Sequence, residues 1–420
     1  MENNNFYFRD SCRMCASNNL EKAMSLTPTP PGNDFLTKNE LGRKENLYPL
    51  DLYFCSDCFH IQLGHVVDPK ILYQKNYTYV SGTSSHFVSH LAQYSEEMIG
   101  RFNLKPDSMV IDIGSNDGTC LSFFKSHGMR VLGIDPAAEV VEIANKNHIH
   151  TINDFFSYEL SISLQEQYGS VDFITSHNAC AHIDNLIDIV KGVEYLLKAD
   201  GVFVLEVGYF VDVYNNTWFD TIYHEHVDFH TVAPFEKLFS RVGMELIRVE
   251  RISPQGGSIR IMAQKIGGKF NRDNTVDSLI ENEKKLDLNK LLTLVSYEKK
   301  INIVKVNLQK LLSKLKDEGK TIAGFGAPTK ATTLMNHFGI NESILDYIVD
   351  ENPLKQGLYT PISHIPIFPS SQIYEKKPDF VLILAWNFAD QIINNHLKYA
   401  KEIGSFILPM PEPQIVNLEK

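Results

Sequence analysis

The chain has 420 residues, against roughly 150 for an average domain, so we expect two or three domains. Hydrophobic residues make up 43% and charged residues 22%, which excludes a fibrous or wholly disordered protein. The net charge of −11 argues against binding to bulk nucleic acid or to anionic membranes, because both need a cationic surface. We therefore expect no nucleic acid partner, no membrane partner and no obligate protein partner.

Targeting signals are the next feature. No apolar run reaches the ~18 residues of a membrane span, and the first ten residues lack the basic and apolar parts of a secretion signal. A cytoplasmic location is the resulting expectation.

Two C-x-x-C pairs lie near the start of the chain, Cys12 with Cys15 and Cys55 with Cys58. Such pairs can direct four thiolates at one tetrahedral ion, so we predict a closed, structural Cys₄ zinc site. The spacing between the pairs is long, and residues 27–35 should loop out between them. A redox motif or paired disulfides are alternatives, but both are less common in a cytosolic chain with the motif repeated.

The organisation along the chain predicts three parts. Residues 1–70 form a zinc module, residues 71–275 a first α/β domain, and residues 276–420 a helical linker with a second, Rossmann-like α/β domain. Alternating strands and helices indicate a doubly wound parallel sheet in both larger parts. Expected strands of the first sheet are 109–114, 129–135, 170–178 and 201–208, and those of the second lie within 320–326, 344–352, 378–388 and 405–410. One or two amphipathic helices are expected over 278–318.

The first glycine-rich turn, Gly114 to Gly118, closes one strand and opens a helix, and Asp135 ends the following strand. The spacing is G-x-x-x-G, typical of S-adenosylmethionine sites, and an acid at that position can bind the ribose hydroxyls. A plain tight turn is the alternative. The residues expected to bind the cofactor are Gly114, Ser115, Asn116, Asp117, Gly118, Asp135, Pro136, Asp154, Phe155 and Asn178.

A histidine-rich segment, residues 218–230, lies between the two sheets. A histidine that titrates near neutral pH beside a carboxylate is a good general base, so this segment is a candidate for catalysis. A second metal site is an alternative, although the H-E-x-x-H spacing is missing. Loop histidines at the surface are another. His182, after the fourth strand of the first sheet, could face the same cleft.

A second glycine-rich turn carries Gly324, Gly326 and Lys330 and enters a helix. A helix N-terminus with glycines and a lysine predicts an anion site, here for a diphosphate. Trp386 and Asn387 follow a later strand, where open sheets bind ligands, and are expected to bind the substrate too. A domain kept only for packing, or a nicotinamide-dependent nucleotide-sugar oxidoreductase, remains an alternative.

Taken in order, the cysteine pairs, PPGNDF (30–35), GSNDG (114–118), YHEH (223–226) and GFGAPTK (324–330) resemble the nucleotide-sugar C-methyltransferase family. The resemblance covers nearly the whole chain. It implies S-adenosylmethionine and structural zinc as cofactors, and a nucleotide-linked 4-keto-6-deoxy sugar (dTDP or GDP) as substrate. It also implies methylation at C3 through an enolate, with inversion, in the biosynthesis of a branched sugar.

The same resemblance implies roles for five residues. His226 would be the base, Tyr223 and Glu225 would surround the sugar, and His182 and Tyr79 would complete the pocket. We further expect Glu225 to orient the ring of His226. An O- or N-methyltransferase, or a zinc-knuckle adaptor for RNA or protein, is an alternative function. The net charge and the lack of basic, aromatic runs near the cysteines speak against the adaptor.

Overall fold

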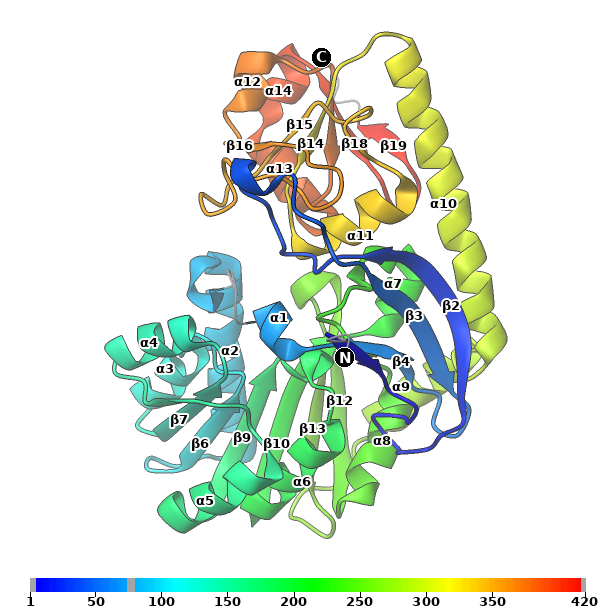
Figure 1. Cartoon of the computed structure of the whole chain (residues 1–420). Helices are drawn as coiled ribbons and strands as arrows, with labels where there is room; N and C mark the ends of the chain where they lie inside the picture. The colour runs from blue at the N-terminus through cyan, green and yellow to red at the C-terminus, as the bar shows by residue number, and fades with distance from the viewer. Residues whose placement is uncertain (1–4, 74–79, 417–420) are drawn as a thin grey trace.

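The computed structural model describes residues 5–73 and 80–416, which form three parts. Figure 1 shows the C-terminal sheet at the top, a larger sheet at the bottom, and the blue N-terminal part between them. We call residues 5–73 the cysteine module. Because this module touches both sheets, it is placed to connect them.

The cysteine module consists mainly of short antiparallel strands. β1 (Phe6–Phe8) pairs with β5 (His65–Val67), and β2 (Leu20–Thr29), β3 (Tyr48–Cys55) and β4 (Ile61–Leu63) form a second sheet. The fourth strand of that sheet is β11 (Asp228–Phe229), which pairs with β4 from far along the chain. The long connection between the cysteine pairs was expected, but residues 27–29 of it belong to β2.

The larger sheet has seven strands in the order β12-β13-β10-β9-β6-β7-β8, and β13 runs antiparallel to its neighbours. Its strands are β6 (Met109–Ile113), β7 (Arg130–Asp135), β8 (Thr151–Asn153), β9 (Val171–His177), β10 (Leu197–Gly208), β12 (Met244–Ile252) and β13 (Ser258–Lys265). The four strands expected here are confirmed, and the α/β fold class with them. Every residue of β6 is buried, as a parallel strand covered on both faces requires.

Helices flank this sheet on both faces (Figure 1). They are α2 (Ser85–Phe102), α3 (Thr119–Ser126), α4 (Ala138–Lys146), α5 (Tyr158–Tyr168), α6 (Leu186–Leu196), α7 (Phe210–Asn216) and α8 (Val232–Arg241), and a short α1 (Pro69–Tyr73) leads into them from the cysteine module. Three of them begin at side-chain caps, since Ser84, Ser157 and Asn185 each accept a backbone N–H of the first turn.

The expected linker is two helices, α9 (Asn274–Lys285) and α10 (Leu291–Asp317). At ~1.5 Å per residue, the 27 residues of α10 extend for roughly 40 Å. Figure 1 shows this helix along one side of the molecule, where it packs against β2. Its buried residues recur every three or four positions, from Leu294 to Leu315, which is the amphipathic pattern that the sequence indicated.

The C-terminal sheet has the order β16-β15-β14-β17-β18-β19, parallel except for the edge strand β19. Its strands are β14 (Ile322–Phe325), β15 (Tyr347–Val349), β16 (Ile367–Phe368), β17 (Phe380–Ile383), β18 (Ser405–Leu408) and β19 (Gln414–Val416). Its helices are α11 (Thr329–Phe338), α12 (Gln372–Lys376), α13 (Ala389–Asn395) and α14 (Leu397–Glu402). All four strands predicted here are present. Among the described residues, the helices are too short or too polar to cross a membrane.

Candidate functional site

The four cysteine thiols converge at one point of the cysteine module. All four Sγ atoms lie within 4.8 Å of one another, with Cys12 and Cys58 3.5 Å apart and Cys15 and Cys55 3.6 Å apart. Four sulfurs about 2.3 Å from one tetrahedral zinc ion would be separated by about 3.8 Å. The geometry therefore fits a Cys₄ zinc site, as predicted.

Both knuckles have the same backbone turn. Ala16 and Phe59, each directly after the second cysteine of its pair, have positive φ of 58° and 68°. Their amides donate to the carbonyls of Cys12 and Cys55, the first cysteines of the pairs. The two pairs are thus built alike, which accounts for the convergence of the four thiols.

The glycine-rich turn after β6 lies against the end of β7. Gly114 has φ +75°, and a Cβ there would be 2.5 Å from the Cβ of Ala179, so this position requires glycine. Asp135 accepts the amide of Asn116 at 2.9 Å and that of Ala137 at 2.9 Å. Its carboxylate is thereby fixed at the edge of the sheet where a ribose is expected.

Residues 81–82 lie over this turn. The amide of Ser81 donates to Asn116 Oδ1 and that of Gly82 to Asp117 Oδ2, both at 2.9 Å. Asp117 also accepts the hydroxyl of Thr119 at 2.7 Å. The side chains of Asn116 and Asp117 thus hold residues 81–82 against the turn.

The other predicted cofactor residues surround the same sheet edge. Asp154 and Phe155 follow β8, and Phe155 is 56% exposed. Pro136 follows Asp135 directly. Asn178, after β9, has φ +56° and donates its amide to the carbonyl of Glu206 at 2.8 Å. The structure thus brings all ten predicted residues to the carboxyl ends of β6, β7, β8 and β9.

His226 is oriented by the backbone. Its Nδ1 lies 2.9 Å from the carbonyl oxygen of Thr221, and its Nε2 lies 2.8 Å from the hydroxyl of Tyr223. Because a carbonyl only accepts, Nδ1 carries the proton, and Nε2 is the basic atom that accepts from the tyrosine. Burial lowers the pKa of His226 to about 3, so the ring is neutral.

Of the two other predicted catalytic residues of the described chain, His182 lies beside this ring and Glu225 contacts the cysteine module. His182 packs edge-on against His226 with 5.0 Å between ring centroids, and burial lowers its pKa to about 4. Glu225 accepts the side-chain amide of Asn33 at 3.1 Å, and burial raises its pKa to about 7. We expected Glu225 to orient the ring of His226. In the structure the backbone carbonyl of Thr221 is the partner of the ring Nδ1. Tyr79 lies outside the described residues.

The cysteine module holds the segment that carries His226. Val227 donates its amide to the carbonyl of Ala181 and accepts the amide of Leu63, both at 2.9 Å. The next residue, Asp228, accepts from His60 Nε2 at 2.6 Å. His60 was not among the residues predicted from the sequence, although a histidine two positions after a knuckle cysteine was a visible signal.

On the other side, the C-terminal domain contacts the same segment. Trp386 donates its indole N–H to Asp220 at 2.7 Å and stacks on Trp218 with 4.5 Å between centroids. Lys330 lies 3.4 Å from a ring centroid of Trp386 and donates to Asn387 at 2.8 Å. Burial lowers the pKa of Lys330 and raises that of Asp220, and each charge partly offsets the shift of the other. Lys330, Trp386 and Asn387 are thus brought together as predicted.

The second glycine-rich turn differs from a phosphate cradle. The amide of Gly326 donates to the carbonyl of Val349 at 2.7 Å, and that of Ala327 donates to Asp350 at 2.6 Å. Pro328 comes next and has no N–H. A Cβ on Gly324 would lie 2.8 Å from the side chain of Ile348, so close packing explains that glycine. These contacts do not favour a nicotinamide dinucleotide at this turn.

A buried polar network that was not predicted from the sequence lies beneath this edge of the larger sheet. Glu206 in β10 accepts from His90 at 2.7 Å, from His177 at 3.1 Å and from Arg260 at 2.7 Å. Burial raises the pKa of Glu206, but the hydrogen bonds from both histidines and the charge of Arg260 outweigh it, so that the pKa falls. An acid within the apolar strand 201–208 was the signal, since a buried acid needs partners. The network fixes α2 to the end of β9.

Comparison with known proteins matches three successive parts of the chain. Models of a zinc binding domain, a methyltransferase domain and a C-methyltransferase C-terminal domain match residues 12–73, 86–249 and 253–411. The C-methyltransferase NovU of Streptomyces niveus is 30% identical over 410 residues, which cover 98% of this chain and 97% of NovU.

Two solved methyltransferases are similar to the middle of the chain. Magnesium protoporphyrin IX methyltransferase of Synechocystis PCC 6803 is 14% identical with a TM-score of 0.33, over 43% of this chain and 81% of that one. Geranyl diphosphate C-methyltransferase of Streptomyces coelicolor A3(2) is 14% identical with a TM-score of 0.34, over 43% and 80%. From its full-length relative and the three matched domains, this chain belongs to the C-methyltransferase family and is an S-adenosylmethionine-dependent enzyme with a zinc-binding module.

Proposed function

We propose that this C-methyltransferase acts at C3 of a 4-keto-6-deoxy sugar that is linked to a nucleoside diphosphate, dTDP or GDP. The observation that carries the proposal is the tautomer of His226. With Nδ1 protonated against Thr221, Nε2 can accept a proton from carbon. A methyl acceptor on oxygen or nitrogen would not need a base that faces a C–H bond.

A saturated sugar carbon becomes a nucleophile only beside a ketone. Once the hydroxyl of Tyr223 has turned from Nε2 of His226 to the keto oxygen, Nε2 takes the C3 proton, and the electron pair of the broken C–H bond delocalises onto that oxygen. S-adenosylmethionine, when bound, supplies the methyl group from a positively charged sulfonium. The new C3–methyl bond forms as the S–methyl bond breaks, so the negative charge of the enolate and the positive charge of the sulfonium cancel. We also propose inversion at C3, because the base and the methyl donor need opposite faces of the sugar.

The enolate oxygen needs hydrogen-bond donors in a dry site, and His226 has suitable neighbours. Tyr223, with its hydroxyl 2.8 Å from Nε2, and His182 are the described candidates, and Tyr79 is proposed from the sequence alone. Lys330 adds a positive charge near enough to lower the pKa of His226 further. We therefore propose that Lys330, Trp386 and Asn387 line the sugar side of the site, and that Gly324 and Gly326 shape the turn.

For the cofactor we propose the residues at the edge of the larger sheet. The turn 114–118 would face the amino acid end, Asp135 the ribose, and Asp154 with Phe155 the adenine. Asn178 would lie near the methyl group. The domain limits at 70/71 and 275/276 and a cytoplasmic location, where thiols stay reduced and available to zinc, belong to the same proposal.

The test is direct. The purified zinc protein is incubated with methyl-labelled S-adenosylmethionine and a panel of dTDP- and GDP-linked sugars, with and without a 4-keto group. We expect label only in ketosugars, on C3. Transfer to a hydroxyl or amine, or to sugars that lack the ketone, would contradict the proposal.

A further inference from the structure

The carbonyl that orients His226 belongs to a short turn, residues 218–222, which we call the Thr221 turn. The backbone oxygen of Thr221 lies 2.9 Å from Nδ1 of His226. Residues 219–221 form one turn of 3₁₀ helix, in which the amide of Ile222 donates to the carbonyl of Phe219 at 3.0 Å. The acceptor at one ring nitrogen decides which nitrogen is left free, so whatever holds this turn in place also acts on the proposed base.

Both chain neighbours of Thr221 are hydrogen-bonded to the C-terminal domain. Asp220, which comes before it, accepts the indole N–H of Trp386 at 2.7 Å. Ile222, which comes after it, accepts the hydroxyl of Thr333 with its backbone carbonyl at 3.0 Å. A peptide unit is planar and nearly rigid, so partners on both sides of Thr221 restrict the direction of the carbonyl between them.

Aromatic contacts hold the same turn against the same domain. Trp218 stacks on Trp386 with 4.5 Å between ring centroids, and Phe219 stacks on Phe338 with 4.6 Å between them. Phe219 is fully buried. Four of the five residues of the Thr221 turn therefore contact the C-terminal domain, and the remaining one supplies the carbonyl.

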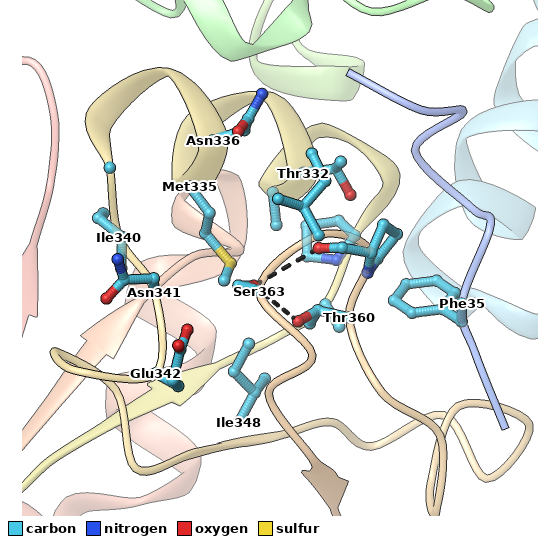
Figure 2. Close-up of a pocket in the computed structure, with 16 residues that line it drawn as sticks. Phe35, Thr332, Met335, Asn336, Ile340, Asn341, Glu342, Ile348, Thr360 and Ser363 are labelled. Atoms are coloured by element: carbon cyan, nitrogen blue, oxygen red, sulfur yellow. Dashed lines mark hydrogen bonds between the residues drawn. The ribbon is translucent and has the colours of Figure 1, made fainter. Parts of the chain in front are cut away.

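Neighbouring threonines of α11 contact two different parts of the chain. Thr333 binds the Thr221 turn, whereas the hydroxyl of Thr332 donates to the carbonyl of Gly32 in the cysteine module, also at 3.0 Å. Figure 2 shows Thr332 and Asn336 of α11 beside a pocket of about 240 Å³. Thr332 thus makes the same kind of bond as Thr333, at the same length, but away from the turn that orients His226.

We propose that the C-terminal domain sets the tautomer of the base. Asp220, Trp386 and Thr333 are the positioning residues, because they keep the carbonyl of the Thr221 turn aimed at Nδ1. The proton of the ring then stays on Nδ1, and Nε2 of His226 is left free to accept a proton from carbon. The inference rests on the proposed role of His226 in the reaction.

The other tautomer of His226 would be inactive. If the carbonyl turns away, Nδ1 loses its acceptor and the proton can move to Nε2, which then donates it to the hydroxyl of Tyr223. A ring with its proton on Nε2 has no lone pair there to accept a proton from carbon. Loss of the positioning contacts should therefore change the tautomer and slow proton removal, with little effect on substrate binding.

The tautomer can be measured directly and without substrate. The zinc protein is labelled with ¹⁵N in its histidine rings, saturated with S-adenosylhomocysteine and studied by NMR at neutral pH. Burial lowers the pKa of His226 to about 3, so its ring is neutral there. Protonated and unprotonated ring nitrogens resonate far apart, and the signals of His226 are those that His226→Asn lacks. We expect wild type to carry the proton on Nδ1.

Two variants each remove one hydrogen bond to the turn. Thr333→Val removes the donor to the carbonyl of Ile222 at nearly the same side-chain volume, and Asp220→Leu removes the acceptor of Trp386. In both variants we expect a signal from protonated Nε2 of His226. The rate of deuterium exchange at C3 of the ketosugar should fall by about tenfold, as the loss of one hydrogen bond predicts, and KM should change less than kcat.

Two matched variants serve as controls. Thr332→Val loses a hydroxyl-to-carbonyl bond of the same length on the same helix, and Asp220→Asn keeps an oxygen that can accept the N–H of Trp386. Both should keep the proton of His226 on Nδ1. Unchanged affinity for S-adenosylhomocysteine shows that each variant is folded.

The outcomes separate this inference from the proposed function. If folded Thr333→Val and Asp220→Leu both keep the proton of His226 on Nδ1, or if wild type carries it on Nε2, the inference is overturned. If Asp220→Leu does not fold, Thr333→Val alone decides. If the tautomer changes as expected but wild type exchanges no hydrogen at C3 of any ketosugar, the positioning role holds and the proposed reaction fails.

Discussion

His60 Nε2 lies 2.6 Å from Asp228 Oδ1, and both side chains are fully buried. The pair joins the start of β4, which follows the second cysteine pair, to β11, which begins two residues after His226. Arg13, also fully buried, lies 4.0 Å from the other oxygen of Asp228. The cysteine module is therefore tied to the segment that carries the proposed base.

Breaking this pair should separate positioning of the base from cofactor binding. His60→Phe leaves the buried carboxylate of Asp228 without its closest partner, which should cost about 3 kcal/mol of unfolding free energy. We expect methyl transfer to fall and the affinity for S-adenosylhomocysteine to stay unchanged, since the cofactor edge is on the larger sheet. Denaturant unfolding, kcat and calorimetry measure the three quantities.

A double variant provides the control for that experiment. His60→Phe combined with Asp228→Leu removes both partners and should recover part of the lost stability. Wild-type transfer rates in the single variant would show that the pair does not position His226.

Loss of zinc should also reduce methyl transfer without weakening the binding of S-adenosylhomocysteine. Cys58→Ser, or treatment with a strong chelator, should release one zinc ion per chain and abolish most methyl transfer, while the larger sheet still binds S-adenosylhomocysteine. Cys180→Ala, a buried cysteine outside the cluster, is the matched control and should keep its zinc. Full transfer activity in zinc-free protein would refute the structural role of the metal.

The parts of this fold that follow from local sequence could be predicted. The buried strand 109–113, the turn at Gly114 and the convergence of the four cysteines all depend on patterns within a few residues or on metal chemistry. Periodicity could not reveal that β11 completes the sheet of the cysteine module, because a two-residue strand has no pattern of its own.

Long-range polar pairs were equally hidden. His60 and Asp228 are 168 residues apart, and Trp386 and Asp220 are 166 apart, so only the folded chain brings them together. The sequence assigned the orientation of His226 to the adjacent Glu225. In the structure a backbone carbonyl, that of Thr221, does this, and carbonyls are identical in every residue.

The pH dependence of activity should report Glu225. Burial raises the pKa of this carboxyl to about 7, while the hydrogen bond from Asn33 and the charge of Lys355 lower it. If the ionised form is active, kcat/KM rises with pH through about 7. Asn33→Ala removes a donor to the carboxylate, so its pKa should rise and the acid limb should move to higher pH.

Glu225→Gln supplies the control, because the limb should disappear when the carboxyl is absent. Because the pKa of Glu225 is raised, its contribution to the free energy of unfolding is largest below the ordinary carboxyl pKa. That contribution is lost as the pH rises through about 7. An acid limb that stays in place in Asn33→Ala would show that another group titrates.

Lys330 should affect the chemical step more than binding. Lys330→Met removes the cation that lies over Trp386 and influences His226, so we expect kcat to fall by about 10²-fold and KM to change little. Lys376→Met is the matched control, because Lys376 lies 4.4 Å from the ring centroid of Phe368, in another part of the same domain. A rise in KM with unchanged kcat would assign Lys330 to substrate binding alone.

Proton removal from carbon is the central claim, and it can be measured without methyl transfer. The zinc protein is incubated in D₂O with the accepted ketosugar nucleotide and S-adenosylhomocysteine, and deuterium at C3 is followed by NMR. Wild type should exchange the hydrogen at C3, whereas His226→Asn should lose both exchange and methyl transfer. His224→Gln is the control and should still exchange, because His224 is a neighbouring buried histidine that binds the carbonyl of Tyr48. Exchange at the wild-type rate in folded His226→Asn would contradict the account.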